Sequence, residues 1–180
     1  MSSFTKNMTA PLDTSFSKRM LQSTFISFCY IDFINIYREL TKALLKEDFH
    51  LEWTIPDNHL CPGITGHINY LNEIHELLSI DPAYSEKQTT ITGIDVGTGA
   101  SCIYPLLGHR LYSWRFIATD IDPESIANSR QLIEINHLQS SIQCIQRSKE
   151  DCMIKDLFEK DSSISFTMCN PPFFGSSDEV

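Results

Sequence analysis

Apolar residues recur at helical spacing in two stretches of the first half of the chain. In residues 34–47 the apolar residues, among them Leu40 and Leu44, would lie along one side of a helix. In residues 68–80 leucine and isoleucine recur at the same spacing. The pattern therefore predicts two helices, followed by a polar linker over residues 81–88.

In the second half of the chain, short β-branched or apolar runs alternate with helical stretches. The expected strands cover residues 89–96, 115–121, 141–146 and 164–169. Asp122, Pro123 and Glu124 predict a helix start, because they supply an N-cap, a first-turn proline and a first-turn acid. This helix should end near Asn136. The alternation predicts an α/β fold in which helices flank a parallel, doubly wound sheet.

Composition places the chain among soluble globular proteins, with 180 residues, 42% hydrophobic and 21% charged. Its apolar stretches are interrupted well before the roughly 20 residues that a membrane span needs. We therefore expect no membrane partner, and a location in the nucleus, the cytoplasm or both. The six cysteines are spread singly, which favours reduced thiols over a metal site.

The net charge of −9 argues against a strong nucleic-acid surface, because such surfaces neutralise phosphates with Lys and Arg. Residues 1–60 carry six basic and seven acidic side chains, whereas residues 61–180 carry eight and sixteen. Any RNA binding by this chain alone is therefore expected to be weak.

A glycine turn follows the first expected strand. Gly97 and Gly99 let the backbone turn tightly and approach a ligand closely. A helix expected to begin at Ala100 and Ser101 would offer N–H groups to a carboxylate or phosphate. Asp120, 23 residues after Gly97, ends the next strand and is placed to accept both hydroxyls of a ribose. The Asp-x-Gly-x-Gly form suits S-adenosylmethionine better than NAD, although a purely structural turn is an open alternative.

A second motif ends the fourth expected strand, on the same sheet edge. It consists of Asn170, Pro171, Pro172 and Phe173. The Asn170 side-chain oxygen and the Pro171 carbonyl can accept both N–H bonds of a conjugated amino group, which makes its nitrogen more nucleophilic. The prolines hold these acceptors rigidly, and Phe173 can stack on a base. This pattern indicates methyl transfer by positioning, without an obligatory strong base.

Other polar and aromatic residues carry less weight. Asp151 follows the third strand, where it would contact an adenine or lie in a solvated loop, and both interpretations stay open. The histidines lack metal-ligand spacing, and the two tryptophans should serve in packing. Four histidines are expected at the surface or in loops, namely His50, His59, His109 and His137.

Three stretches resemble the RNA adenine-N6 methyltransferases that modify the spliceosomal U6 small nuclear RNA, and their bacterial relatives that modify 23S ribosomal RNA. They are residues 95–108, 118–120 and 168–174, and weaker matches extend the resemblance over about residues 31–175. It implies a Rossmann-like class I methyltransferase fold, bound S-adenosylmethionine, and residues 170–173 holding the target adenine. The cofactor residues implied are His67, Gly97, Thr98, Gly99, Ser101, Asp120, Asp151 and Asn170.

The chain departs from that family's pattern in three ways. His67 stands where the family usually has a cofactor-site arginine, and a neutral imidazole lacks its fixed charge. The first 30 residues do not resemble the basic RNA-binding leader. The chain ends at Val180, so we expect the remaining strands, a gating loop and a basic RNA surface to be missing. A truncated isoform, a fragment or an incomplete gene sequence would give this pattern, with marginal stability expected.

These observations leave three functions open. The first is an RNA adenine-N6 methyltransferase, with residues 1–88 as a mostly helical leader and 89–180 as the first half of the cofactor-binding domain. The second is a protein-glutamine or DNA amino methyltransferase, which Phe173 disfavours because that motif more often ends in tyrosine. The third is a noncatalytic binding module, which the acidic charge favours.

Overall fold

The computed structural model describes residues 33–85, 90–150, 154, 156–158 and 163–171. The chain divides into two compact units, Met1–Glu39 and Leu40–Val180. Of the first unit, residues 33–39 are described, and they are helical. Helical structure covers residues 33–49 in all, which confirms the helix predicted for 34–47.

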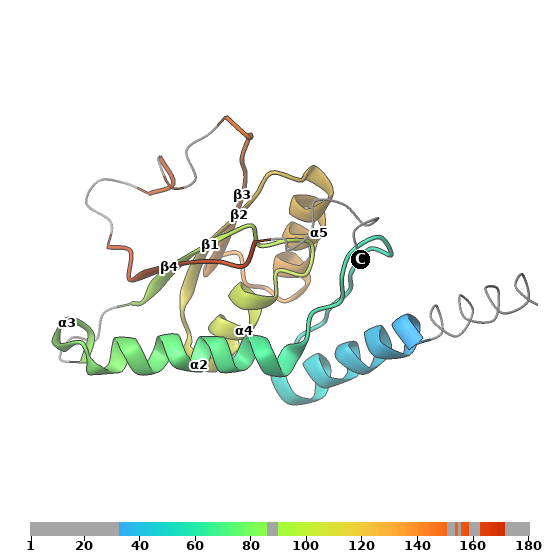
Figure 1. The fold of residues 1–180 in the computed structure, drawn as a ribbon, viewed down its shortest axis with the longest axis horizontal. Helices are drawn as coiled ribbons and strands as arrows, with labels where there is room; N and C mark the ends of the chain where they lie inside the picture. Colours follow the sequence, from blue (N-terminus) through green and yellow to red (C-terminus); the bar gives the residue numbers. More distant parts are fainter. Residues whose placement is uncertain (1–32, 86–89, 151–153, 155, 159–162, 172–180) are drawn as a thin grey trace, which may run out of the picture. The chain divides into compact units, whose positions relative to one another are not determined.

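Helices and strands alternate through the second unit (Figure 1). In chain order they are α2 (Ile64–Ile80), α3 (Pro82–Ser85), β1 (Thr92–Val96), α4 (Ile103–Tyr112), β2 (Arg115–Asp120), α5 (Pro123–Ile135), β3 (Ile142–Gln146) and β4 (Phe166–Cys169). None of the helices in the described ranges is long and apolar enough to cross a membrane.

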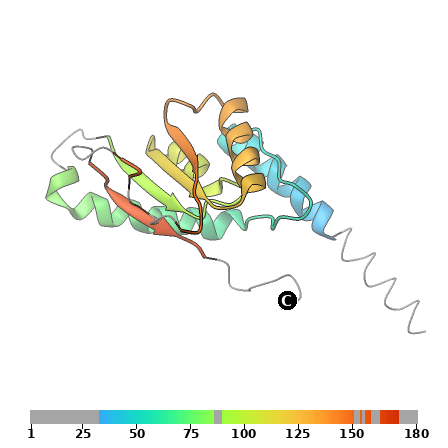
Figure 2. The same cartoon turned by 90° about the horizontal axis from the view of Figure 1, so that it is seen from above.

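The four strands form one parallel sheet in the order β3-β2-β1-β4. Gly93 of β1 pairs with Phe116 of β2 and with Phe166 of β4, which sets the register on both sides of the central strand. Seen from above, the strands cross at successive angles, as expected of a twisted sheet (Figure 2). The structure confirms the predicted parallel sheet flanked by helices.

Three predicted boundaries were wrong. The helix α4 begins at Ile103 rather than at Ala100, because Cys102 takes a left-handed conformation (φ 47°) that delays the helix. The polar linker contains the short helix α3. The helix α2 begins at Ile64, four residues before its predicted start, and Gly66 lies within its first turn.

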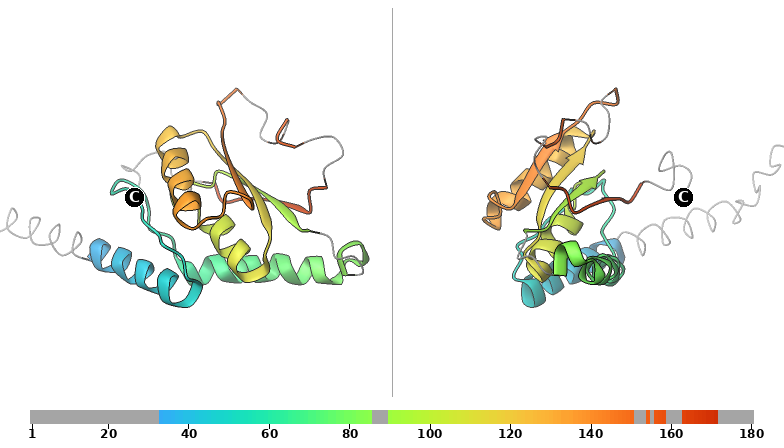
Figure 3. Two further views of the ribbon diagram at one scale, coloured as in Figure 1. Left: turned by 180° about the vertical axis from the view of Figure 1, so that it is seen from behind. Right: turned by 90° about the vertical axis from the view of Figure 1, so that its left-hand side faces the viewer.

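The three longer helices of the unit cover one face of the sheet. Figure 3 shows α4 between α2 and α5. The core between helices and sheet includes Leu71 of α2, Leu106 of α4, Leu132 of α5 and Phe116 of β2. Alternate strand residues face the other side, where Ile94, Ile117 and Leu157 form a smaller buried cluster.

The apolar stripes of the helices are narrower than the sequence pattern indicated. Leu40 is 61% exposed and Leu77 is 65% exposed, although both fell on the predicted stripes. The buried positions of α2 are Ile64, Leu71 and Leu78, at intervals of seven residues. A stripe of this width is what a helix buries when it packs along a single neighbouring surface.

Two glycine-to-alanine changes should have opposite effects on stability. A Cβ at Gly93 would overlap the Cζ atom of Phe166, whose ring packs against Trp114 at a centroid distance of 5.0 Å. We expect Gly93→Ala to lower the free energy of unfolding by about 1–3 kcal/mol. Gly66 lies in α2, and no atom lies within 4 Å of the place that an alanine Cβ would take there. Gly66→Ala should therefore raise the free energy of unfolding by about 0.5–1 kcal/mol. Urea unfolding of both variants measures the two effects, and equal signs would contradict the packing described.

Candidate functional site

Three candidate residues lie side by side at the carboxyl edge of the sheet. The last residue of β1 pairs with Thr119 of β2 and with Cys169 of β4. The residues that follow these positions, Gly97, Asp120 and Asn170, are therefore neighbours along this edge. Ligands of open parallel sheets bind outside this edge.

The glycine turn after β1 has an open outer side. Gly97 has φ +77° and Gly99 has φ +64°, which are left-handed values that favour glycine. The backbone N–H groups of Gly97 and Thr98 donate to the carbonyl of Thr119 at 2.8 and 2.9 Å, which ties the turn to β2. No atom lies within 4 Å of where a Cβ would stand on either glycine. The turn thus leaves space for a ligand to approach its backbone.

Asp120 holds the glycine turn as well as facing the same edge. Its Oδ2 accepts from the N–H of Gly99 at 2.8 Å, and its Oδ1 accepts from the N–H of Asp122 at 2.9 Å. Each carboxylate oxygen has two lone-pair sites, so both retain capacity to accept a further hydrogen bond. Asp120 can therefore bind a pair of ligand hydroxyls while it fixes the turn.

Asp95 is a buried acid directly beneath the turn. Burial raises the pKa of Asp95 to about 7; the Thr98 hydroxyl lowers it, and the charge of Asp120 adds to the increase. Asp95 is 1% exposed. Within the described ranges, no bond with full hydrogen-bond geometry reaches its Oδ2 or the Oγ1 of Thr98, so the Thr98 hydroxyl acts on this acid through a looser contact.

The raised pKa of Asp95 predicts a pH-dependent stability. Between the ordinary value of 3.8 and about 7, the folded chain holds a proton that the unfolded chain releases. Protonated Asp95 therefore stabilises the folded chain fully below pH 3.8. As the pH rises to about 7 this stabilisation is lost, and the free energy of unfolding falls by about 2–4 kcal/mol. Asp95→Asn should flatten this part of the profile, as urea unfolding from pH 4 to pH 8 would show. Parallel profiles for the two proteins would contradict the assignment.

His67 lies beside the helix that follows the glycine turn. Its ring centroid is 4.7 Å from that of Tyr104 in the first turn of α4. Its Nδ1 is 2.7 Å from the carbonyl oxygen of Gly63. A carbonyl only accepts, so Nδ1 carries the proton and Nε2 is the nitrogen left to contact another group. Nearby, burial raises the pKa of Tyr104, and the charge of Asp95 adds to that increase.

The second motif is described in part. Asn170 and Pro171 are exposed and directly follow β4. Pro172, Phe173 and Asp151 lie outside the described residues, so their predicted roles stay predictions.

Most of the remaining sequence predictions concern packing. Trp53 and Trp114 are 5% and 2% exposed, which confirms that they belong to the core. His50, His59 and His137 lie outside the helices and strands, as predicted. The prediction was wrong for His109, which is half-buried in α4 with its Nδ1 3.0 Å from the carbonyl oxygen of Trp114. Among the residues that the structure describes, no group of three His, Cys, Asp or Glu side chains could hold a metal ion.

Three further residues contact the glycine turn, and no sequence pattern indicated them. Trp53, Asn128 and Ser129 each donate a hydrogen bond to a backbone carbonyl of this turn. Trp53 was expected to pack, but nothing in the sequence indicated its hydrogen bond. Asn128 and Ser129 belong to no recognisable motif. Their partners lie 28 and 30 residues earlier in the chain, so no local pattern indicates these bonds.

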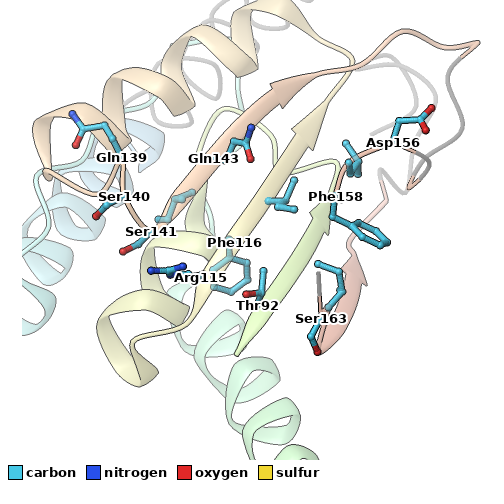
Figure 4. Close-up of a pocket in the computed structure, with 14 residues that line it drawn as sticks. Thr92, Arg115, Phe116, Gln139, Ser140, Ser141, Gln143, Asp156, Phe158 and Ser163 are labelled. Atoms are coloured by element: carbon cyan, nitrogen blue, oxygen red, sulfur yellow. The ribbon is translucent and has the colours of Figure 1, made fainter. Parts of the chain in front are cut away.

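A separate hollow of about 980 Å³ lies at the opposite edge of the sheet (Figure 4). Its lining includes Thr92, Arg115 and Ile142, which are the first residues of β1, β2 and β3. The hollow is therefore distinct from the edge that carries Gly97, Asp120 and Asn170.

Comparison with known proteins agrees with this geometry. A sequence profile described as an RNA methyltransferase family matches residues 18–180. The U6 small nuclear RNA (adenine-(43)-N(6))-methyltransferase of Schizosaccharomyces pombe is 42% identical over 151 residues, which cover 83% of this chain and 39% of that protein. Ribosomal RNA large subunit methyltransferase F of Pseudomonas putida is 39% identical over 154 residues, which cover 83% of this chain and 49% of that protein.

A solved structure also resembles the chain. The N-terminal domain of human METTL16 in complex with SAH superposes with a TM-score of 0.67 at 36% identity, covering 76% of this chain and 52% of that one. The chain thus spans about half or less of the length of these relatives.

Proposed function

Because the chain belongs to this RNA methyltransferase family, we propose that it serves in transfer of a methyl group from S-adenosylmethionine to the N6 amino group of adenine in structured RNA. The observation that carries this proposal is the strand register, which makes Gly97, Asp120 and Asn170 neighbours at one sheet edge. The residues proposed to contact the cofactor are therefore adjacent to the residue proposed to contact the adenine, as a direct methyl transfer requires.

The carboxyl edge has the features that S-adenosylmethionine would need. The open side of Gly97 and Gly99 admits the ligand close to the backbone, and Asp120 accepts the ribose hydroxyls. When bound, the cofactor supplies an electrophilic methyl group on a positively charged sulfur.

Asn170 and Pro171 are the residues proposed to hold the target adenine. The Asn170 side-chain oxygen and the Pro171 carbonyl accept the two N6–H bonds, and thereby direct the nitrogen lone pair toward the methyl carbon. With the cofactor bound, the N6 nitrogen would take the methyl group as the methyl–sulfur bond broke, and water would then take the surplus proton. The roles of Pro172 in rigidity, Phe173 in base stacking and Asp151 in adenine contact belong to this proposal on sequence alone.

His67 and Ser101 complete the proposed cofactor contacts. His67 lies next to Tyr104 at the start of α4, and its Nε2 is the nitrogen available to a ligand. An arginine at this position would offer a fixed positive charge and two hydrogen bonds to the cofactor carboxylate, whereas an imidazole offers one contact. We therefore expect His67 to bind that carboxylate more weakly than an arginine would. Ser101 is half-buried at the end of the glycine turn.

The organisation of the whole chain is part of the same proposal. Residues 89–180 would form the first half of the cofactor-binding domain, with residues 1–88 as a leader. Eight basic against sixteen acidic side chains in residues 61–180 predict weak RNA binding by this chain alone. A nuclear or cytoplasmic location follows from an RNA substrate. The same acidic balance favours, as a second candidate, a module that binds the cofactor or a partner without catalysis.

One assay separates these functions. The chain is titrated with S-adenosylmethionine by calorimetry, and then incubated with a hairpin RNA that contains one unpaired adenine. We expect binding, followed by N6-methyladenosine detected by mass spectrometry of the digested RNA. Binding without transfer would support the noncatalytic module, and neither binding nor transfer would refute the proposed function.

A further inference from the structure

Three successive carbonyl groups of the glycine turn each accept a hydrogen bond from a side chain. The pairs are Ser129 Oγ with Gly99 O at 2.8 Å, Asn128 Nδ2 with Ala100 O at 2.7 Å, and Trp53 Nε1 with Ser101 O at 3.0 Å. We call this set of three donors the carbonyl clamp.

Chemistry fixes which atom donates in the hydrogen bonds of the carbonyl clamp. An indole N–H only donates, and a carbonyl only accepts, so the Asn128 amide must point its NH2 group at the turn. The second N–H of this group donates to Thr54 O at 3.1 Å, which uses both of its donors. Ser129 is fully buried and Trp53 is 5% exposed, so water does not compete strongly for these bonds.

Trp53 and Thr54 belong to residues 52–59, a segment without helix or strand that ends in a turn at residues 57–59 and that we call the strap. The strap runs antiparallel to α5 and is bonded to it near both ends (Figure 1). The contacts are Glu52 N with Asn136 Oδ1 at 2.9 Å, Glu52 O with Asn136 Nδ2 at 2.7 Å, Asn58 Nδ2 with Glu124 Oε2 at 3.0 Å, and His59 Nε2 with Ser125 Oγ at 3.3 Å. These four contacts hold the strap along α5, and none of them involves a residue of the glycine turn.

The carbonyl clamp fixes the direction of the N–H groups on the other side of the turn. A trans peptide unit is planar, with its C=O and N–H pointing in opposite directions. Holding the carbonyls of residues 99–101 toward α5 and the strap therefore directs the N–H groups of residues 100–102 away from them. The N-cap residue of α4, Cys102, makes no side-chain capping hydrogen bond of its own. The orientation of this turn thus depends on donors from outside it.

We propose that Trp53, Asn128 and Ser129 are positioning residues that hold the glycine turn in its cofactor-binding conformation. This inference rests on the proposed function, because it assigns the turn to S-adenosylmethionine. A turn that is fixed before the ligand arrives does not lose backbone freedom on binding, so the carbonyl clamp raises cofactor affinity without touching the cofactor. The strap, which precedes the sheet in sequence, thereby becomes part of the site.

The test uses two pairs of variants of the full chain. Asn128→Ala is paired with Asn136→Ala. Asn128 lies in α5 and Asn136 is the C-cap of that helix, and both bond the strap, but only Asn128 also bonds the glycine turn. Trp53→Phe is paired with Trp114→Phe, since both tryptophans are buried and Trp114 contacts the rings of Tyr112, Phe116 and Phe166. For each variant, amide hydrogen exchange of residues 100–102 is measured without cofactor, and S-adenosylmethionine affinity by calorimetry.

Asn128→Ala and Trp53→Phe should speed exchange of the three amides by about tenfold and weaken cofactor binding by about three- to tenfold. Asn136→Ala and Trp114→Phe should leave both quantities near the wild-type values, even where they lower the melting temperature. Equal effects within each pair would overturn the carbonyl clamp, because the losses would then reflect stability alone. Wild-type chain that fails to bind the cofactor would refute the proposed function, and the exchange rates of the free chain would still decide the carbonyl clamp.

Discussion

Asp120→Ala should reduce the affinity for S-adenosylmethionine by about a hundredfold. The change removes the acceptors proposed for the ribose hydroxyls, and hydrogen bonds to a charged group are worth about 1.5–3 kcal/mol each. It also removes the carboxylate that holds the N–H of Gly99 at 2.8 Å, so the glycine turn keeps only its two backbone bonds to Thr119 at the end of β2. Calorimetric titration of the variant with the cofactor measures the loss.

Asp122→Ala is the matched control, because Asp122 is an acid two residues farther along the chain, at the N-cap of α5. Its Oδ2 accepts from the N–H of Ser125 at 2.8 Å and thereby caps α5. Its removal should lower the free energy of unfolding by about 1 kcal/mol and change cofactor affinity little. An affinity loss as large for Asp122→Ala as for Asp120→Ala would show that the loop, rather than the Asp120 carboxylate, determines binding.

Asn170→Ala should reduce methyl transfer by about a hundredfold or more. The Asn170 side-chain oxygen is proposed to accept one N6–H bond in the transition state, and removal of one such preorganised group typically costs about 10²–10³ in rate. Asn170 is exposed at the end of β4, so its truncation should cost little stability. Transfer to the hairpin RNA at saturating cofactor measures the effect.

Cys169→Ser controls for disturbance of the strand end, because Cys169 is exposed and directly precedes Asn170. We expect this variant to transfer methyl groups at nearly the wild-type rate. Asn170→Ala should also bind the cofactor within a few-fold of the wild-type affinity. Transfer that survives in Asn170→Ala would remove Asn170 from the reaction and leave the base site unassigned.

The parts of the fold that could be predicted are those specified by neighbouring residues. Asp122 caps α5 through Ser125, as the sequence Asp-Pro-Glu indicated, and the helix ends at Ile135 beside the predicted Asn136. Strand β2 matched its prediction within one residue, because its apolar run is bounded on both sides by polar residues. The position of Asp120 beside Gly97 followed from the rule that carboxyl ends of parallel strands share an edge.

The parts that could not be predicted depend on contacts between distant residues. Trp53 bonds Ser101 across 48 positions, and Asn136 bonds Glu52 across 84. No local pattern encodes either pair, since tryptophan and asparagine at those positions are equally compatible with a plain packing or surface role. The late start of α4 likewise required the left-handed Cys102, a conformation that is uncommon outside glycine, asparagine and aspartate.

The most direct test of the account is whether one ligand reaches the glycine turn, Asp120 and Asn170 together. The full 180-residue chain is labelled with nitrogen-15, and its amide spectrum is recorded during titration with S-adenosylhomocysteine. We predict that the amides of Gly97, Gly99 and Asp120 and the side-chain amide of Asn170 shift with one common dissociation constant. Shifts confined to residues 139–143, which line the hollow at the opposite edge, would contradict the account.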